Sequence, residues 1–125
     1  MSTEIVVTEG LLARLYDITI QQGADFNLVV LYKDTDGGEV SGLTTAEMQV
    51  RLWAGDSTKI IDLDETSGLT INEAKGEITI LIEAADTAVL DAPANLTYDL
   101  EATLDEGEVV RLIEGQCLVT AGVSR

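Results

Sequence analysis

The sequence lacks histidine entirely, has one cysteine and one proline among 125 residues, and is only 4% aromatic. Without histidine, the usual serine or cysteine triad cannot form, and zinc sites with histidine ligands are excluded. The lone Cys117 permits no disulfide within the chain, and its apolar surroundings suit a buried thiol. The glycine motifs that bind phosphates and dinucleotides are also missing. We therefore expect neither an enzyme nor a cofactor.

Basic residues are scarce, with 7 against 23 acidic ones, and the formal net charge is −16. Such a charge repels nucleic acid and anionic membrane surfaces, and it favours basic protein partners. No apolar run approaches the roughly 20 residues that span a bilayer, and the N-terminus has no signal-peptide pattern. We expect no membrane or nucleic-acid partner and folding in a cytoplasm.

What the chain does contain is apolar residues, at 46%, in a pattern that alternates with polar residues almost throughout. Alternation with period two is typical of half-buried strands, and Gly/Asp turns separate the segments. One example is residues 96–104, and another is 46–53, where Met48, Val50 and Leu52 share a face. The pattern predicts an all-β domain, a single antiparallel sandwich of about eight strands, immunoglobulin-like or related. A small barrel fits the same alternation. Only residues 84–90 predict a short helical turn.

The predicted organisation is a sandwich over residues 14–125, preceded by residues 1–13 as an arm or an extra strand. Within the arm, Ile5, Val6 and Val7 form a β-prone segment. Such a segment pairs either with a neighbouring subunit or with the chain's own sheet, and both readings remain open.

Arg51 and Arg111 stand out because basic residues are so few. The simplest expectation for each is an exposed cross-strand ion pair inside the domain. The alternative is a bidentate contact to an acidic patch of a neighbouring subunit. With Ile5, Val6 and Val7, these two arginines are the candidate protein-interface residues.

Two local features have alternative interpretations. The loop Asp34–Glu39 begins like a calcium-binding loop, but Thr45 stands where a bidentate glutamate is needed. We therefore expect a plain turn there, and we predict no metal site. Gly115 interrupts a strand-like run and predicts a bulge or bend.

The ordered run of segments through the chain resembles a known module. It comprises Ile20–Phe26, Met48–Arg51, Gly76–Ile80, an Ala/Thr-rich stretch ending at Leu90, Tyr98–Glu101, Val109–Gly115 and Val119. Over residues 16–125 this order is similar to the N-terminal immunoglobulin-like module of phage baseplate upper proteins and related tail-fibre or virion proteins.

The resemblance implies a structural protein of a tailed phage, assembled in the bacterial cytoplasm and located in the virion. It implies a tail, baseplate or fibre-anchoring adaptor that contacts other virion proteins, as a homo-oligomeric ring or trimer. A capsid decoration protein is the first alternative. Because the sequence stops at Arg125, we expect no receptor-binding head. A glycan-binding module is a weaker alternative, with Trp53 and Tyr32 as its stacking pair.

Overall fold

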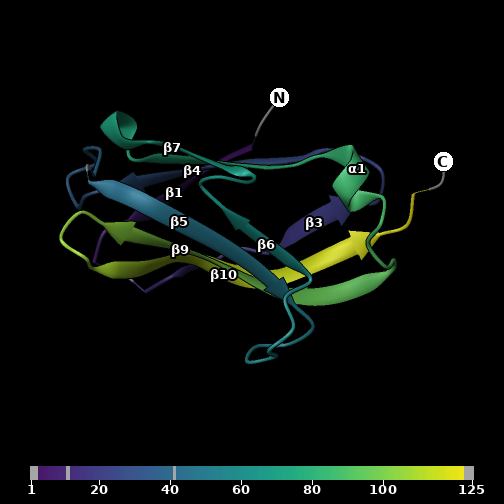
Figure 1. Cartoon of the computed structure of the whole chain (residues 1–125). Helices are drawn as coiled ribbons and strands as arrows, with labels where there is room; N and C mark the ends of the chain where they lie inside the picture. Colours follow the sequence, from purple (N-terminus) through teal and green to yellow (C-terminus); the bar gives the residue numbers. More distant parts are fainter. Residues whose placement is uncertain (1–2, 11, 41, 123–125) are drawn as a thin grey trace.

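The structure, a computed structural model, describes residues 3–10, 12–40 and 42–122. Met1, Ser2 and Leu11 of the predicted arm, and Arg125 at the end of the resemblance, lie outside the described residues. The described part is a two-layer β-sandwich (Figure 1), which confirms the predicted all-β sandwich. Its elements are β1 (Thr3–Thr8), β2 (Arg14–Leu15), β3 (Ile18–Gln21), β4 (Phe26–Lys33), β5 (Leu43–Arg51), β6 (Ile61–Asp64), β7 (Leu69–Asn72), the 3-10 turn η1 (Glu73–Lys75), β8 (Glu77–Ile82), α1 (Ala84–Thr87), β9 (Ala94–Leu104) and β10 (Val109–Thr120).

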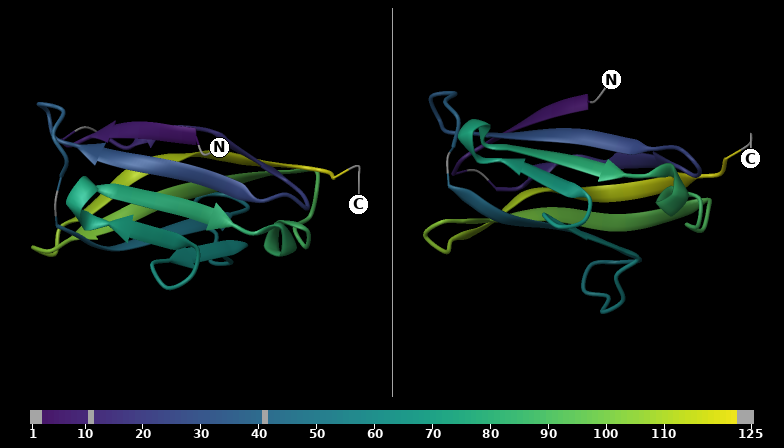
Figure 2. Two further views of the ribbon diagram at one scale, coloured as in Figure 1. Left: turned by 90° about the horizontal axis from the view of Figure 1, so that it is seen from above. Right: turned by 45° about the horizontal axis from the view of Figure 1, so that its top comes forward.

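The two sheets are mixed, which corrects the expectation of a purely antiparallel sandwich. The four-stranded sheet has the order β1-β4-β8-β7, and the six-stranded sheet has the order β2-β10-β9-β5-β6, with β3 also pairing with β10. β1 runs parallel to β4, and both β2 and β3 run parallel to β10. The chain crosses between the layers after β1 and again after β3 (Figure 2). Such crossovers permit parallel pairs, whereas a tight hairpin imposes antiparallel ones.

The core lies between the sheets and is aliphatic, with Tyr98 as its largest fully buried side chain. In β9 the predicted alternation is correct, because Leu96, Tyr98, Leu100 and Ala102 are all buried. In β5 the alternation ends early, since Met48 and Val50 are buried while Leu52 is 52% exposed. A turn ends β5 at this point: the N–H of Asp56 donates to the carbonyl of Trp53 at 3.1 Å.

The irregularity in β10 lies earlier than predicted. The register between β9 and β10 shifts between Arg111 and Ile113, so Leu112 is the extra residue. Gly115 has a different role, because a Cβ added there would lie 2.6 Å from the carbonyl oxygen of Tyr16 and 2.8 Å from Asp17 Oδ1. It therefore allows the segment between β2 and β3 to approach β10 closely.

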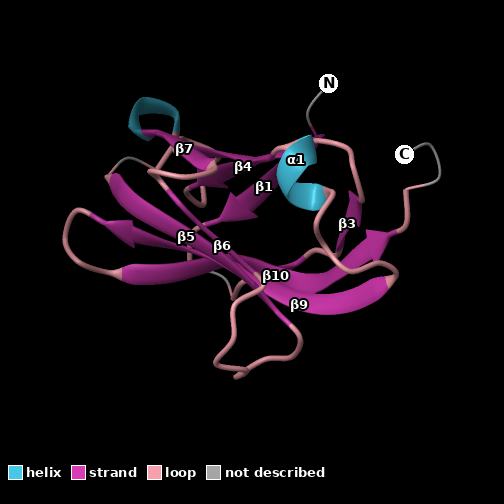
Figure 3. Ribbon diagram, turned by 45° about the vertical axis from the view of Figure 1, so that its right-hand side comes forward, coloured by secondary structure: helices cyan, strands magenta, loops and turns pink. Residues whose placement is uncertain are grey.

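The short helix α1 closes one end of the sandwich (Figure 3). The Oγ1 of Thr87 donates to the carbonyl of Ala24 at 2.8 Å and accepts from the N–H of Gly23 at 3.0 Å. At its N-terminus, the N–H of Ala84 donates to Asp25 Oδ1 at 2.7 Å. These bonds tie the helical turn to the β3–β4 connection, so a single turn is stable without a hydrophobic face of its own.

Candidate protein-interaction surfaces

The three apolar candidates of the N-terminal segment lie in β1, in the chain's own four-stranded sheet. Ile5 and Val7 point into the core and are each 5% exposed, while Val6 faces outward. Their partners in β4 are Val30 and Tyr32 for the two buried residues. The structure therefore contains this segment as an extra strand of the chain's own sheet. Two of the three apolar side chains of the segment belong to the core.

The outer edge of β1 is partly covered by an arginine. Arg14 Nη1 donates to the carbonyl oxygen of Val6 at 2.7 Å. On the other side of the strand, the N–H of Glu9 donates to the carbonyl of Lys33 at 2.6 Å, as expected from the alternating direction of backbone groups. Arg14 therefore satisfies an edge acceptor that would otherwise attract another strand.

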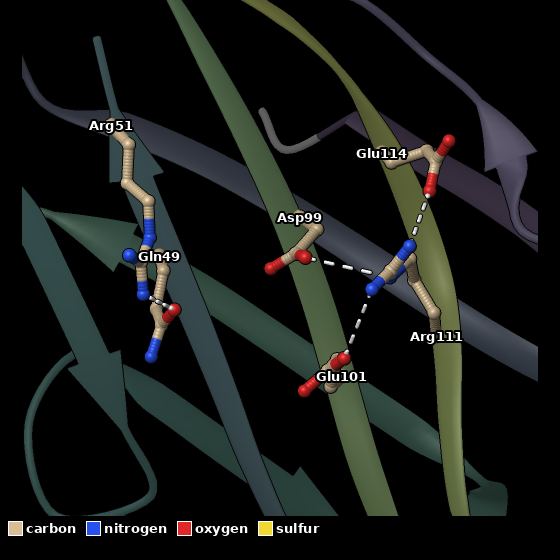
Figure 4. Close-up of polar contacts among 6 residues, drawn as sticks. All are labelled: Gln49, Arg51, Asp99, Glu101, Arg111 and Glu114. Atoms are coloured by element: carbon tan, nitrogen blue, oxygen red, sulfur yellow. Dashed lines mark hydrogen bonds and ion pairs between the residues drawn. The ribbon is translucent and has the colours of Figure 1, made fainter. Parts of the chain in front are cut away.

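Arg111 makes the predicted cross-strand ion pairs on the outer face of the six-stranded sheet (Figure 4). Its Nε lies 3.4 Å from Asp99 Oδ2, its Nη2 lies 3.5 Å from Glu101 Oε2, and its Nη1 lies 3.2 Å from Glu114 Oε1. One guanidinium thus serves three carboxylates from β9 and β10. Because the group is half exposed, water screens each pair and its contribution to stability is small.

The charged groups of this cluster change the pKa values of Arg111 and Asp99. The hydrogen bond that Arg111 donates to Glu114 raises the pKa of Arg111, and the negative charges of Asp99 and Glu101 add to this effect. Burial raises the pKa of Asp99, Glu101 raises it further, and the positive charges of Arg111 and Arg51 oppose both effects. The cluster places three carboxylates around one guanidinium on the sheet face.

The ion pair expected for Arg51 is wrong. Register places Arg51 opposite Thr97, and its guanidinium donates instead to the side-chain oxygen of Gln49 and to the carbonyl of Asp56. Asp99 lies near enough for the charge of Arg51 to act on its pKa, but this carboxylate is paired with Arg111, whose Nε lies 3.4 Å from Asp99 Oδ2. Arg51 thus holds a loop in place.

Arg51 and Arg111 nevertheless line the same groove of about 600 Å³ on the outer sheet face. Figure 4 shows Arg51 on β5 and Arg111 on β10, with Asp99 on the strand between them. Of the five candidate residues, the structure brings these two together and leaves β1 in the other sheet. The groove offers carboxylates and guanidinium donors, which are suited to exchanging ion pairs with another protein.

The sequence analysis named Trp53 only as a sugar-stacking residue and did not count the loop that Arg51 holds among the candidate protein interfaces. Residues 52–60, called here the 52–60 hairpin, join β5 to β6 and project away from both sheets (Figures 1 and 2). They carry three large exposed apolar side chains: Trp53 at 60%, Leu52 at 52% and Ile60 at 37% exposure. The available signal was Leu52–Trp53, two adjacent large apolar residues just before the Gly55–Ser57 segment, which is typical of a turn.

The 52–60 hairpin is well ordered by hydrogen bonds. Besides the turn from Trp53 to Asp56, the N–H of Thr58 donates to Asp56 Oδ1 at 3.2 Å. At the base, the N–H of Ile60 donates to the carbonyl of Val50 at 2.7 Å. The exposed aromatic ring is therefore presented on a defined backbone, which lowers the entropy lost when a partner binds.

Two further expectations concern side chains outside these surfaces. Tyr32 is buried, so it cannot stack with Trp53 on a sugar, and that proposed pair is wrong. In the Asp34–Glu39 loop, Asp34 Oδ1 accepts hydrogen bonds from the N–H groups of Asp36 at 2.9 Å and Gly38 at 2.8 Å. The first aspartate of that loop thus stabilises a turn. No helix in the described part of the chain is long and apolar enough to cross a membrane.

Comparison with known proteins finds a likeness of fold but none of sequence. No protein-family model matches the sequence, and no curated protein matches it. Among solved structures, the chain is similar to the N-terminal domain of phage TP901-1 ORF48, with a TM-score of 0.52 and 8% sequence identity. The likeness covers 95% of this chain and 98% of that domain. The two share a fold over most of their lengths.

Proposed function

We propose that this chain is a structural component of a tailed-phage particle, acting in the tail or baseplate as an adaptor that contacts other virion proteins. The observation that carries the proposal is the fold shared with the N-terminal domain of phage TP901-1 ORF48 over 95% of the chain. The order of sequence segments that resembles phage baseplate upper proteins supports the same assignment, including its immunoglobulin-like character.

The exposed features fit a protein that works by contact. The outer face of the six-stranded sheet presents a charged groove, and the 52–60 hairpin presents an aromatic ring. Aromatic and arginine side chains are the residues that most often dominate binding energy in protein interfaces. The net charge of −16 favours basic surfaces on the other virion proteins.

Disruption of the gene in the phage that encodes it tests the proposal. We expect particles with incomplete tails in negative-stain electron micrographs, and we expect the wild-type chain supplied in trans to restore complete ones. As a control, a resupplied chain with Val89→Ala, a substitution at an 81% exposed side chain outside both candidate surfaces, restores assembly equally. Complete, infectious particles that lack the chain would overturn the proposed function.

A further inference from the structure

The first strand of the chain lies at the edge of its sheet (Figure 2). β1 is at one end of the four-stranded sheet, and β4 is its strand partner. The pairing is parallel, so no tight hairpin joins the two strands. Between them the chain passes through the six-stranded sheet as β2 and β3. Because β4 also pairs with β8 on its other side, β1 can leave the sheet without unpairing any other strand.

β1 fills a site that the rest of the sandwich builds. Ile5 and Val7 are each 5% exposed and lie opposite Val30 and Tyr32 of β4. Without β1, both core positions and the backbone groups along this edge of β4 would be open to water. The site therefore requires a parallel strand with apolar side chains at alternate positions, and β1 is such a strand.

The connection from β1 to β2 packs loosely against the sandwich. The chain turns at Gly10, where φ is 83°, and Leu12 in the connection and Leu15 in β2 are 93% and 76% exposed. A crevice of about 780 Å³ opens between residues of this connection and the start of β10. Exchange of a strand between copies changes the path of the connecting segment, so a loosely packed connection loses few contacts when its path changes. β1 therefore combines a well-defined site with a connection suited to exchange.

We infer that β1 is exchanged between copies of this chain: β1 of one copy pairs with β4 of the next, and its Ile5 and Val7 fill the core of that copy. Every exchanged contact is one that the chain already makes with itself, so the interface needs no further complementary surface. In a closed ring each copy gives one strand and receives one, so no site is left empty. This inference deepens the proposed function, on which its biological purpose rests, by naming a second copy of the chain as a partner.

Mass action decides which copy supplies the strand. In dilute solution the chain's own β1 is tethered beside its site, and this high effective concentration favours the unexchanged form. Exchange becomes favourable when neighbouring copies are concentrated, as in a symmetric particle. Two copies of charge −16 also repel each other, and about 0.15 M salt screens this repulsion beyond about 8 Å. The test therefore uses concentrated protein in salt of this strength.

Single cysteines at paired positions of β1 and β4 test the exchange. Val6 lies opposite Leu31, and residues paired in adjacent strands have Cα atoms about 5 Å apart, which a disulfide can bridge. Val6→Cys and Leu31→Cys chains are refolded together from urea with a reductant, which is then replaced by oxidised glutathione. A disulfide between positions 6 and 31 forms only where β1 of one copy lies in another. We expect this heterodimer on a non-reducing gel, in a fraction that rises with protein concentration. Its absence at every concentration overturns the inference.

A matched position controls for random collision between chains. Leu81→Cys replaces Leu31→Cys in a second mixture, because Leu81 is 39% exposed in the same sheet but lies opposite Asn27, away from β1. Peptide mapping identifies the cysteines that are joined, and the native Cys117 is fully buried in the folded chain. We expect several-fold less heterodimer from this mixture. Equal yields from the two mixtures would show that collision alone joins the chains, and the inference would then be wrong.

Gly10→Pro in the Val6→Cys chain tests the role of the connection. Proline fixes φ near −65° and cannot adopt the 83° of Gly10, so the turn between β1 and β2 is disfavoured. We expect the heterodimer fraction at a given concentration to rise several-fold. Gly37→Pro, at another exposed turn where φ is 87°, should leave the fraction unchanged, and circular dichroism checks the fold of both variants. An unchanged or smaller fraction with Gly10→Pro contradicts the exchange.

Failure of this inference is distinguishable from failure of the proposed function. The cross-link is measured on the purified chain, whereas gene disruption reports on particle assembly whichever copy supplies β1. Heterodimer formation without a tail defect would support the exchange and overturn the tail role. A tail defect without heterodimer formation would do the reverse.

Discussion

The β9–β10 pair and the 52–60 hairpin belong to the same six-stranded sheet but use their apolar residues in opposite ways. In β9 and β10, Tyr98 and Cys117 are buried in the core. Gly115 has no side chain, so the backbone of Tyr16 can lie against it. In the 52–60 hairpin, Trp53 and Leu52 are exposed, and hydrogen bonds within the loop and from Arg51 order the backbone. The difference indicates that the residues that stabilise the fold and the residues available for binding lie in separate regions. Substitutions in β9 and β10 should destabilise the protein, whereas substitutions in the 52–60 hairpin should alter only what it binds.

The largest effect is expected from Gly115→Val in β10. The new side chain would collide with the carbonyl oxygen of Tyr16 and with Asp17 Oδ1. Both residues are held to β10, because the N–H of Tyr16 donates to the carbonyl of Glu114 and Asp17 Oδ1 accepts from the N–H of Gln116. We expect the free energy of unfolding to fall by about 3 kcal/mol. Urea denaturation measures this, with Leu118→Val, an exposed site in the same strand, as control. Equal stabilities of the two variants would show that β10 tolerates a side chain at position 115.

A smaller loss is expected from Tyr98→Phe. The Tyr98 hydroxyl donates to the carbonyl of Tyr16, and the ring is almost fully buried. Removing the hydroxyl leaves that carbonyl without its donor at a cost of about 1.5 kcal/mol. Urea denaturation of this variant beside Tyr16→Phe, which keeps the backbone acceptor, isolates the hydrogen bond. If both variants lose the same amount, the bond to Tyr98 is not the cause.

Alkaline pH should weaken the β9–β10 region through Cys117. Burial raises the pKa of this thiol from 9.0 to about 12, so the folded chain retains a proton that the unfolded chain releases. The contribution of the protonated thiol to the free energy of unfolding is complete below pH 9 and is lost as pH rises towards 12. At pH 10 we expect the free energy of unfolding to be lower by about 1 kcal/mol. Comparing unfolding free energies at pH 7 and 10 in wild type and Cys117→Ala measures it. Parallel losses in both proteins would assign the effect to other groups.

The smallest effect on stability is expected from Arg51→Ala, within about 0.5 kcal/mol, because the residue is at the end of β5 and bonds only to its own strand and loop. Loss of the bond to Asp56 should instead loosen the 52–60 hairpin. Limited proteolysis should then cut within residues 52–60 several-fold faster, whereas Arg111→Ala should leave that cleavage rate unchanged. Equal rates for both variants would remove the positioning role of Arg51.

The sequence predicts the parts of the fold that depend on local pattern. Alternation identified β9 correctly, and Gly/Asp composition identified the turn at Asp34–Glu39, because both follow from neighbouring residues. The parallel pairing of β1 with β4 was not predictable, since strand partners depend on the path of the chain between the layers. The candidate surfaces also depend on strand pairing, which local pattern does not predict. Arg111 lies opposite Glu101 and pairs with carboxylates as expected, but the register between β5 and β9 places Arg51 opposite the uncharged Thr97.

The most direct test of the account is the number of copies of this chain in purified phage particles, measured by quantitative mass spectrometry. An adaptor in the tail or baseplate follows the symmetry of the tail, so we predict a small multiple of three or six, on the order of ten copies. A count on the order of hundreds would contradict the tail assignment and indicate a capsid decoration protein. Absence of the chain from the particle would contradict a structural role in the virion.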